Sequence, residues 1–221
     1  MGSSRPAAGG GRWVSVDPAR LPRWLAGFGQ RHGDPVAVPA AGGVLLVTGS
    51  GDGVTAELYP PPGAAGGSDL AGFVADAQVP RRLGLLLARR SAAAVGLAAG
   101  AELLSSKVDS WYVQSRTAAG GQSQQRFARR RGNQAAAAAG RAADLVADRL
   151  LPAAGELAAV VTGGDRGTVE TILSDPRLAR LARLRAGRLL AVPTPNLAVL
   201  RAAVAAARAV DIRLPPTVAP G

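Results

Sequence analysis

The stretch KVDSWYVQSRTAAGGQSQQRFARRR, residues 107–131, places a strand-like segment, a loop of small residues and an arginine-rich segment in direct succession. Residues 111–115 have the composition of a strand, and residues 117–122 carry no large apolar side chain. The residues after them have a helical pattern, so we expect a long helix over residues 123–150. A loop held at both ends by regular elements is a common place for functional residues, and the loop 117–122 is therefore our candidate site.

The segments on either side of this stretch predict the sheet that carries it. Residues 83–89 and 93–98 are apolar and flank a bend at Arg89, Arg90 and Ser91, which indicates an antiparallel pair. One or two further strands are expected within residues 101–113. After the long helix the pattern alternates: strand 157–162, helix 168–184, strand 189–192, helix 196–210 and strand 212–214. Such alternation adds parallel strands with right-handed crossovers, and the prediction is an α+β fold with a mixed β-sheet covered by helices.

The residues before this sheet predict a second, smaller unit. A strand at 13–16 precedes Asp17-Pro18, a helix-start signal, and apolar residues then recur at helical spacing up to Gly33. Short strands follow at 36–38, 44–48 and 54–59, and the proline- and glycine-rich residues 60–68 form a linker. The expected division is a disordered leader (1–11), a small N-terminal α/β subdomain (12–62), a linker or connecting segment (63–79), a catalytic domain (80–214) and a disordered tail (215–221).

Composition excludes several classes of function. The 221 residues include no cysteine and one histidine, which excludes disulfides, zinc–thiolate sites and histidine-rich metal sites. No close pair of carboxylates is placed by sequence as a metal or acid–base site, so we expect no metal and no cofactor. No apolar run approaches the roughly 20 residues of a membrane span, and the N-terminus lacks an apolar signal core. A cytoplasmic protein with no membrane partner is expected.

Charge and glycine patterns point to a polyanionic partner. The formal net charge is +11, a balance typical of nucleic-acid binding. Six arginines and no carboxylate fall between Arg116 and Arg141, and such a one-signed cluster favours phosphate contact over an ordinary solvated face. The glycine runs at 49–53 and 163–167 lack the spacing of nucleotide-binding loops, and we interpret them as a hairpin turn and a tight strand-to-helix turn.

The tripeptide Gly120-Gly121-Gln122 carries little information alone in a chain with 29 glycines, but its context is specific. The pattern GGQSxxRFARxR, residues 120–131, resembles the catalytic loop and helix in the middle domain of eukaryotic and archaeal class I peptide-chain release factors. The likeness extends over about residues 81–214. A standalone domain of this kind is similar to the Vms-like release factor (VLRF) family of peptidyl-tRNA hydrolases, most closely its actinobacterial members.

The resemblance implies a ribonuclease-H-like release-factor middle domain and hydrolysis of the ester between a nascent peptide and tRNA, in the peptidyl-transferase centre of the large ribosomal subunit. It implies Gly120, Gly121 and Gln122 as catalytic residues. The glycines permit backbone angles closed to other residues, and the glutamine can orient water or stabilise an oxyanion without titrating. The partners implied are large-subunit rRNA and peptidyl-tRNA, for a monomeric protein. The residues expected to bind RNA are Arg116, Arg126, Arg129, Arg130, Arg131 and Arg141.

Nothing in the sequence corresponds to a codon-reading domain or to a zinc finger, so rescue of stalled ribosomes or split large subunits fits better than stop-codon recognition. Cleavage within the tRNA 3′ end is an alternative to ester hydrolysis. Two other classes stay open: a non-catalytic rRNA- or tRNA-binding module associated with the ribosome, and a general structural domain whose arginines reflect coding bias.

Overall fold

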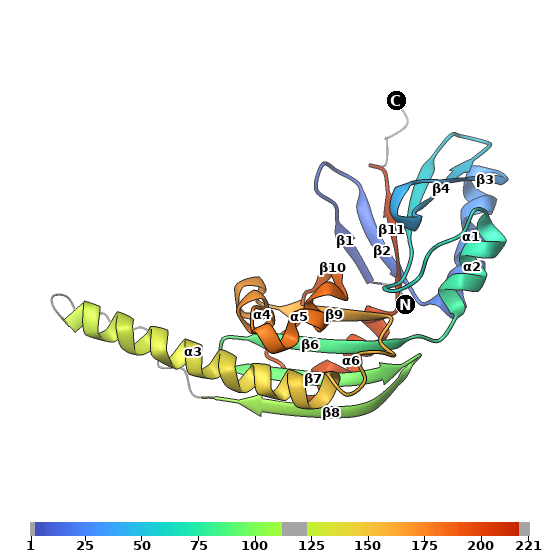
Figure 1. Ribbon diagram of the computed structural model, residues 1–221. Helices are drawn as coiled ribbons and strands as arrows, with labels where there is room; N and C mark the ends of the chain where they lie inside the picture. The colour runs from blue at the N-terminus through green and yellow to red at the C-terminus, as the bar shows by residue number, and fades with distance from the viewer. Residues whose placement is uncertain (1–2, 112–122, 217–221) are drawn as a thin grey trace. The chain divides into compact units, whose positions relative to one another are not determined.

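The computed structural model describes residues 3–111 and 123–216 (Figure 1). The chain divides into two compact units, which are described separately. The N-terminal unit comprises Met1–Pro80 together with Ala205–Gly221, and the central unit comprises Arg81–Val204. Among the described residues, no helix has both the length and the apolar character needed to cross a membrane.

The N-terminal unit is a six-stranded sheet with helices packed on it. The strand order is β1-β2-β11-β5-β4-β3, and neighbouring strands pair antiparallel throughout the described part of the sheet. An antiparallel sheet makes this unit α+β, whereas we expected a small α/β subdomain. Its elements are β1 (Ser3–Pro6), β2 (Arg12–Val16), η1 (Pro18–Arg20), α1 (Leu21–His32), β3 (Pro35–Pro39), η2 (Ala41–Gly43), β4 (Leu45–Gly49), β5 (Thr55–Tyr59), α2 (Leu70–Gln78) and β11 (Val210–Leu214).

The C-terminal strand β11 completes this N-terminal sheet. It pairs with β2 on one side and β5 on the other, and both Val210 and Ile212 are fully buried in the core with Phe28 and Leu58. The prediction that residues 212–214 form a strand in the sheet of the catalytic domain is therefore wrong. The central unit ends at Val204, rather than at residue 214 as expected for the catalytic domain. The apolar alternation identified a strand correctly, but alternation does not specify the sheet in which a strand pairs.

Two other boundaries also differ from the sequence prediction. Ser3–Pro6 forms β1 and pairs with β2, so the expected disordered leader contains a strand. The expected connecting segment 63–79 contains α2, which begins where Asp69 accepts a hydrogen bond from the Gly72 backbone N–H and which buries Phe73 and Ala77. Aspartate is a favoured helix cap and these two side chains belong to the core of the N-terminal unit, so α2 is part of that unit.

The central unit contains a five-stranded mixed sheet with the order β10-β9-β6-β7-β8. The strands β6, β7 and β8 form an antiparallel meander, while β9 pairs in parallel with β6 and with β10. This confirms the expected antiparallel pair, the parallel component and the mixed sheet. The elements are β6 (Arg82–Arg89), β7 (Ala92–Ala99), β8 (Glu102–Ser110), α3 (Ser123–Leu150), β9 (Ala159–Gly164), α4 (Arg166–Leu173), η3 (Pro176–Leu178), α5 (Ala179–Arg183), β10 (Arg185–Leu190) and α6 (Leu197–Ala207).

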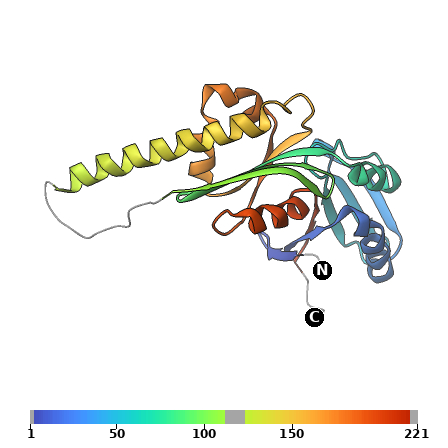
Figure 2. The same cartoon turned by 90° about the horizontal axis from the view of Figure 1, so that it is seen from below.

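Helices cover both faces of this sheet. Figure 2 shows α3 and α4 on one face and α6 on the other. On the first face, Leu86 and Val95 pack with Val146 and Leu150 of α3. On the second face, α6 lies close to β7, because a Cβ added at Gly96 would be 3.1 Å from the Leu200 side chain. Because both faces are covered, the central strand β6 is a continuous apolar run, LGLLLA, rather than an alternating one.

The single helix predicted over residues 168–184 is interrupted. The helix α4 ends at Leu173, and η3 and α5 follow after Asp175-Pro176. Proline has no N–H to donate to the preceding turn, and it restricts the residue before it to extended angles, as at Asp175 with ψ 123°. The break keeps these helices short and packed against the sheet.

Candidate functional site

The chain that leaves β8 is fixed to the turn between β6 and β7. The backbone N–H of Trp111 donates to the carbonyl oxygen of Ser91 at 2.9 Å, and its indole Nε1–H donates to the carbonyl oxygen of Arg90 at 2.7 Å. The strand β8 ends at Ser110, so the strand predicted to begin at Trp111 does not begin there, and residues 112–115 lie outside the described residues. Trp111 is thus the last described residue before the candidate loop, and two hydrogen bonds hold it.

The helix α3, on the far side of the loop, is held by its C-terminal part. Its buried side chains among the described residues run from Ala138 to Leu150, and they pack against β7 and β8 and against α4 and η3. Many of them are alanines, whose small side chains allow the helix to lie close to the sheet. The N-terminal half of α3 extends past the ends of the strands in both views (Figures 1 and 2). The arginine-rich half of the helix is therefore the part that leaves the sheet.

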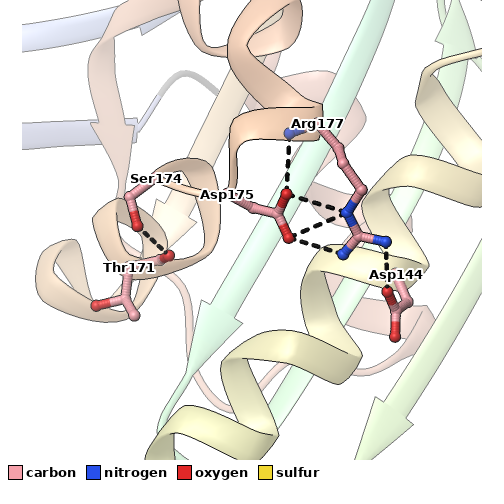
Figure 3. Close-up of polar contacts among 5 residues, drawn as sticks. All are labelled: Asp144, Thr171, Ser174, Asp175 and Arg177. Carbon is pink, nitrogen blue, oxygen red and sulfur yellow. Dashed lines mark hydrogen bonds and ion pairs between the residues drawn. The ribbon is translucent and has the colours of Figure 1, made fainter.

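An ion-pair group also attaches α3 to η3. Arg177 donates through Nε and Nη2 to the carboxylate of Asp175, and its Nη1 lies 2.9 Å from Oδ1 of Asp144 on α3 (Figure 3). The side-chain hydrogen bond from Arg177 is the largest cause that lowers the pKa of the Asp175 carboxyl, and the Arg177 backbone N–H adds to it. Asp175 first and Asp144 second raise the pKa of Arg177. Such fork-like contacts fix direction as well as distance, so they orient α3 on this face.

A cation–π contact joins the residue that follows β8 to the middle of α3. The guanidinium carbon of Arg141 on α3 lies 5.7 Å from the centre of the Trp111 ring, within the usual range for this interaction. The side chain of Arg141 is exposed, and no described carboxylate pairs with it. Its charge is thus available to an anion, while the ring constrains its position.

The neighbouring strand-to-helix turn 163–167 is a closed turn, as the sequence predicted. The carboxylate of Asp165 accepts hydrogen bonds from the Thr168 backbone N–H at 2.8 Å and from its hydroxyl at 2.7 Å, which caps α4. The Thr168 hydroxyl is the largest cause that lowers the pKa of Asp165, and the Thr168 N–H is the second. Since the cap already occupies the helix N-terminus, this turn offers no open anion site.

The predicted site residues fall into three groups. Gly120, Gly121, Gln122 and Arg116 lie outside the described residues. Arg126, Arg129, Arg130 and Arg131 lie on α3, where the structure describes the helix. Arg141 is described with its side chain, and its contact is the one with Trp111. The catalytic and RNA-binding roles therefore stay predictions.

Sequence reasoning did not assign a role to Trp111 or to the bend residues Arg89 and Arg90, which are exposed. The contact with the Arg90 carbonyl links two segments that are 21 residues apart in the chain. A tryptophan a few residues before the loop of small residues 117–122 was the available signal. Within residues 3–111 and 123–216, no group of three or more histidine, aspartate or glutamate side chains could hold a metal ion.

Comparison with known proteins identifies a matching family and several similar solved structures, of which two are described. The model of the family described as Actinobacteria/chloroflexi VLRF1 release factor matches residues 81–213. The crystal structure of the archaeal translation termination factor aRF1 is similar, with a TM-score of 0.43 and 16% sequence identity, and the match covers 85% of this chain. The structure of a second archaeal protein is similar with a TM-score of 0.38 and 17% sequence identity, and that match covers 86% of this chain. This chain covers 61% and 62% of those two chains, less than two thirds of their length. No curated protein matches it.

Proposed function

Because the chain belongs to the Actinobacteria/chloroflexi VLRF1 release-factor family, whose model matches residues 81–213, we propose that it is a ribosome-dependent peptidyl-tRNA hydrolase. It releases nascent chains from stalled ribosomes or large subunits, as a factor of ribosome rescue and quality control. One observation carries the proposal. The Gly120-Gly121-Gln122 sequence lies within the matched region, between a strand whose exit is fixed at Trp111 and a helix whose first turns are rich in arginine.

The proposed chemistry is attack of water on the carbonyl carbon of the peptidyl ester, with departure of the tRNA ribose 3′ oxygen. Gly120 and Gly121 provide a narrow tip that can approach the ester. Gln122 does not titrate, so it acts by orienting the water with its side-chain amide and by donating its backbone N–H to the developing oxyanion. Positioning supplies the rest of the rate enhancement, and RNA groups form most of the site.

The proposed RNA contacts lie along α3. Arg126, Arg129, Arg130 and Arg131 bind phosphates, as does Arg116, which comes directly before the loop 117–122 in the sequence. The packing of α3 and the contact between Asp144 and Arg177 set the direction of this helix on the sheet. In that direction the arginine-rich half of α3 extends beyond the strands (Figure 2), which supports the assignment. Arg141 contributes a cation whose position Trp111 restricts.

The strand order also supports the finer fold assignment. Three antiparallel strands, β6 to β8, are followed by β9 and β10, which pair in parallel on the other side of β6. We infer from this order that the central unit is a ribonuclease-H-like release-factor middle domain. A monomeric, cytoplasmic protein that contacts large-subunit rRNA and peptidyl-tRNA is part of the same proposal.

The test is release of peptide from purified large subunits that carry peptidyl-tRNA. We expect Gln122→Ala and Gly121→Ala to reduce the release rate strongly, while Gln124→Ala, a matched control outside the tripeptide, leaves it near wild type. Undiminished release by the Gln122 and Gly121 variants would remove the loop from the mechanism. Cosedimentation with the ribosome without release would favour the alternative, a non-catalytic RNA-binding module, and a tRNA fragment without its 3′ end would indicate cleavage of the tRNA instead.

A further inference from the structure

The N-terminal unit contains a cavity of about 620 Å³ to which the proposed function assigns no role. Its walls come from β2, from one side of α1 and from the residues at the end of α6 that belong to this unit. Much of the wall is apolar, with Val14 and Val16 from the strand and Ala205 and Ala209 from the C-terminal segment. A volume of this size lies in the range of small-ligand sites, roughly 300–1,000 Å³.

Three arginines line the cavity. Arg20, Arg23 and Arg31 are exposed, and among the described residues none of them forms an ion pair. The carboxylate on the wall, Asp17, accepts a hydrogen bond from the Ala19 backbone N–H at 2.9 Å and lies 3.6 Å from the Arg208 guanidinium. Because that carboxylate is already compensated, the cavity carries a net positive charge and favours an anionic occupant.

A flat aromatic wall accompanies these charges. Trp24 lines the cavity and stacks on Phe28, with ring centroids 5.5 Å apart and an interplanar angle of 21°. Phe28 is fully buried, so the stack restricts the tryptophan ring. One turn along α1, Gly27 leaves space beside the ring, because a Cβ added there would meet only the Arg31 guanidinium, at 3.4 Å. A planar ring of a ligand can lie against such a surface.

We propose that this cavity binds one unstacked nucleotide of a single-stranded RNA segment. The base lies against Trp24 over the apolar wall, and the phosphates are held by Arg20, Arg23 and Arg31, whose guanidinium groups match phosphate oxygens in geometry. An acidic peptide would satisfy the arginines but would leave the aromatic wall unused. The assignment to RNA, rather than to another polyanion, rests on the proposed function. It gives the N-terminal unit a role of its own, as an RNA contact separate from the arginines of α3.

The test uses the full-length protein and a single-stranded RNA of about eight nucleotides that contains photoreactive 4-thiouridine. We expect a crosslink in the peptide that contains Trp24. Gly27→Leu fills the space beside the ring and should lower this crosslink about tenfold, the scale of one lost base stack. Leucine is a better helix former than glycine, so the variant should keep its thermal stability. Arg23→Gln should lower the crosslink as well, whereas Arg12→Gln, an equal loss of charge outside the cavity lining, should not.

Two results would overturn the proposal: crosslinks confined to α3, or an unchanged Trp24 crosslink in Gly27→Leu. Equal competition by poly-glutamate and by unlabelled RNA at the same charge concentration would show a general anion site and would overturn the nucleotide assignment. The release assay separates this proposal from the proposed function. If Gln122→Ala loses release but the wild type gives no Trp24 crosslink, the nucleotide-binding proposal alone is rejected. If Gln122→Ala releases peptide normally but the Trp24 crosslink is lowered by Gly27→Leu, the proposed hydrolase function alone is rejected.

Discussion

The guanidinium of Arg141 lies 5.7 Å from the centre of the Trp111 ring, and this contact joins α3 to the residue that follows β8. The same indole donates a hydrogen bond to the carbonyl oxygen of Arg90 at 2.7 Å, which fixes the ring on the turn between β6 and β7. One aromatic side chain thus contacts the strand turn, the exit of β8 and the helix. These contacts fix the residue that follows β8 against the turn between β6 and β7 and against the middle of α3.

The coupling between these two side chains should be measurable. We expect a double-mutant cycle with Trp111→Leu and Arg141→Met to give a coupling energy of about 0.5–1 kcal/mol in the free energy of unfolding, as for an exposed cation–π pair. Urea unfolding of the wild type, the two single variants and the double variant provides the four values. Additive effects of the two substitutions would show that the pair makes no energetic contact in solution.

Charge reversal on α3 should weaken binding to the ribosome and flatten its salt dependence. In Arg129→Glu/Arg130→Glu the slope of log affinity against log salt should become shallower by roughly 1–2, since each lost phosphate contact removes about 0.7–0.9. Cosedimentation with large subunits at several salt concentrations measures this slope. Arg183→Glu/Arg201→Glu is the matched control, because both side chains are exposed and unpaired among the described residues, on α5 and α6. An equal effect of the two double variants would mean that net charge alone drives association.

The succession of strands and helices in the central unit could be predicted from the sequence, because each element is indicated by residues close together in the chain. The apolar runs of β6 and β7 around the bend at Arg89 and Arg90 predict a hairpin, and alternation of strands and helices predicts the parallel strands. The place of β11 could not be predicted in this way. Val210 and Ile212 have the pattern of a half-buried strand, which suits either sheet equally. Their pairing with β2 and β5 depends on packing between segments about 150–200 residues apart.

The residue types of the candidate site could be predicted from the sequence, but the contacts that hold Trp111 beside it could not. The tripeptide and the arginines of α3 are visible in the sequence because the proposed function requires those residue types at fixed spacing. The supports of Trp111 are backbone carbonyl groups of Ser91 and Arg90, which every residue possesses. Hydrogen bonds to backbone carbonyl groups do not require a particular residue type, so the sequence does not indicate them and only the three-dimensional structure does.

The cap of α4 should make stability depend on pH in the acidic range. Hydrogen bonds from Thr168 lower the pKa of the Asp165 carboxyl in the folded protein, with a smaller contribution from the charge of Arg89. A carboxyl with a depressed folded pKa stabilises the fold above its unfolded pKa, about 3.9, and this stabilisation is lost as the pH falls through the folded value. Asp165→Asn keeps a capping side chain that does not titrate. The free energy of unfolding should therefore fall more steeply in wild type than in this variant below about pH 4.

Urea unfolding of the two proteins between about pH 7 and pH 2 tests this expectation. Asp165→Ala removes the cap itself and should cost about 1 kcal/mol near pH 7, where Asp165→Asn should cost less. Parallel pH profiles for wild type and Asp165→Asn would show that the Asp165 carboxyl does not contribute to the acid sensitivity.

Gly164 should be the glycine in this turn that no other residue can replace. Its φ is 99°, and an added Cβ would lie 2.2 Å from the carbonyl oxygen of Ala88, the oxygen that accepts the hydrogen bond from the Asp165 N–H at 2.8 Å. The substitution Gly164→Ala must therefore shift the backbone of β6 beside Arg89, and we expect it to cost at least about 2 kcal/mol of the free energy of unfolding. Gly187→Ala on β10 is the control, since nothing lies within 4 Å of its added Cβ. It should change stability by less than about 1 kcal/mol. Equal effects of the two substitutions in urea unfolding would show that this turn tolerates a side chain.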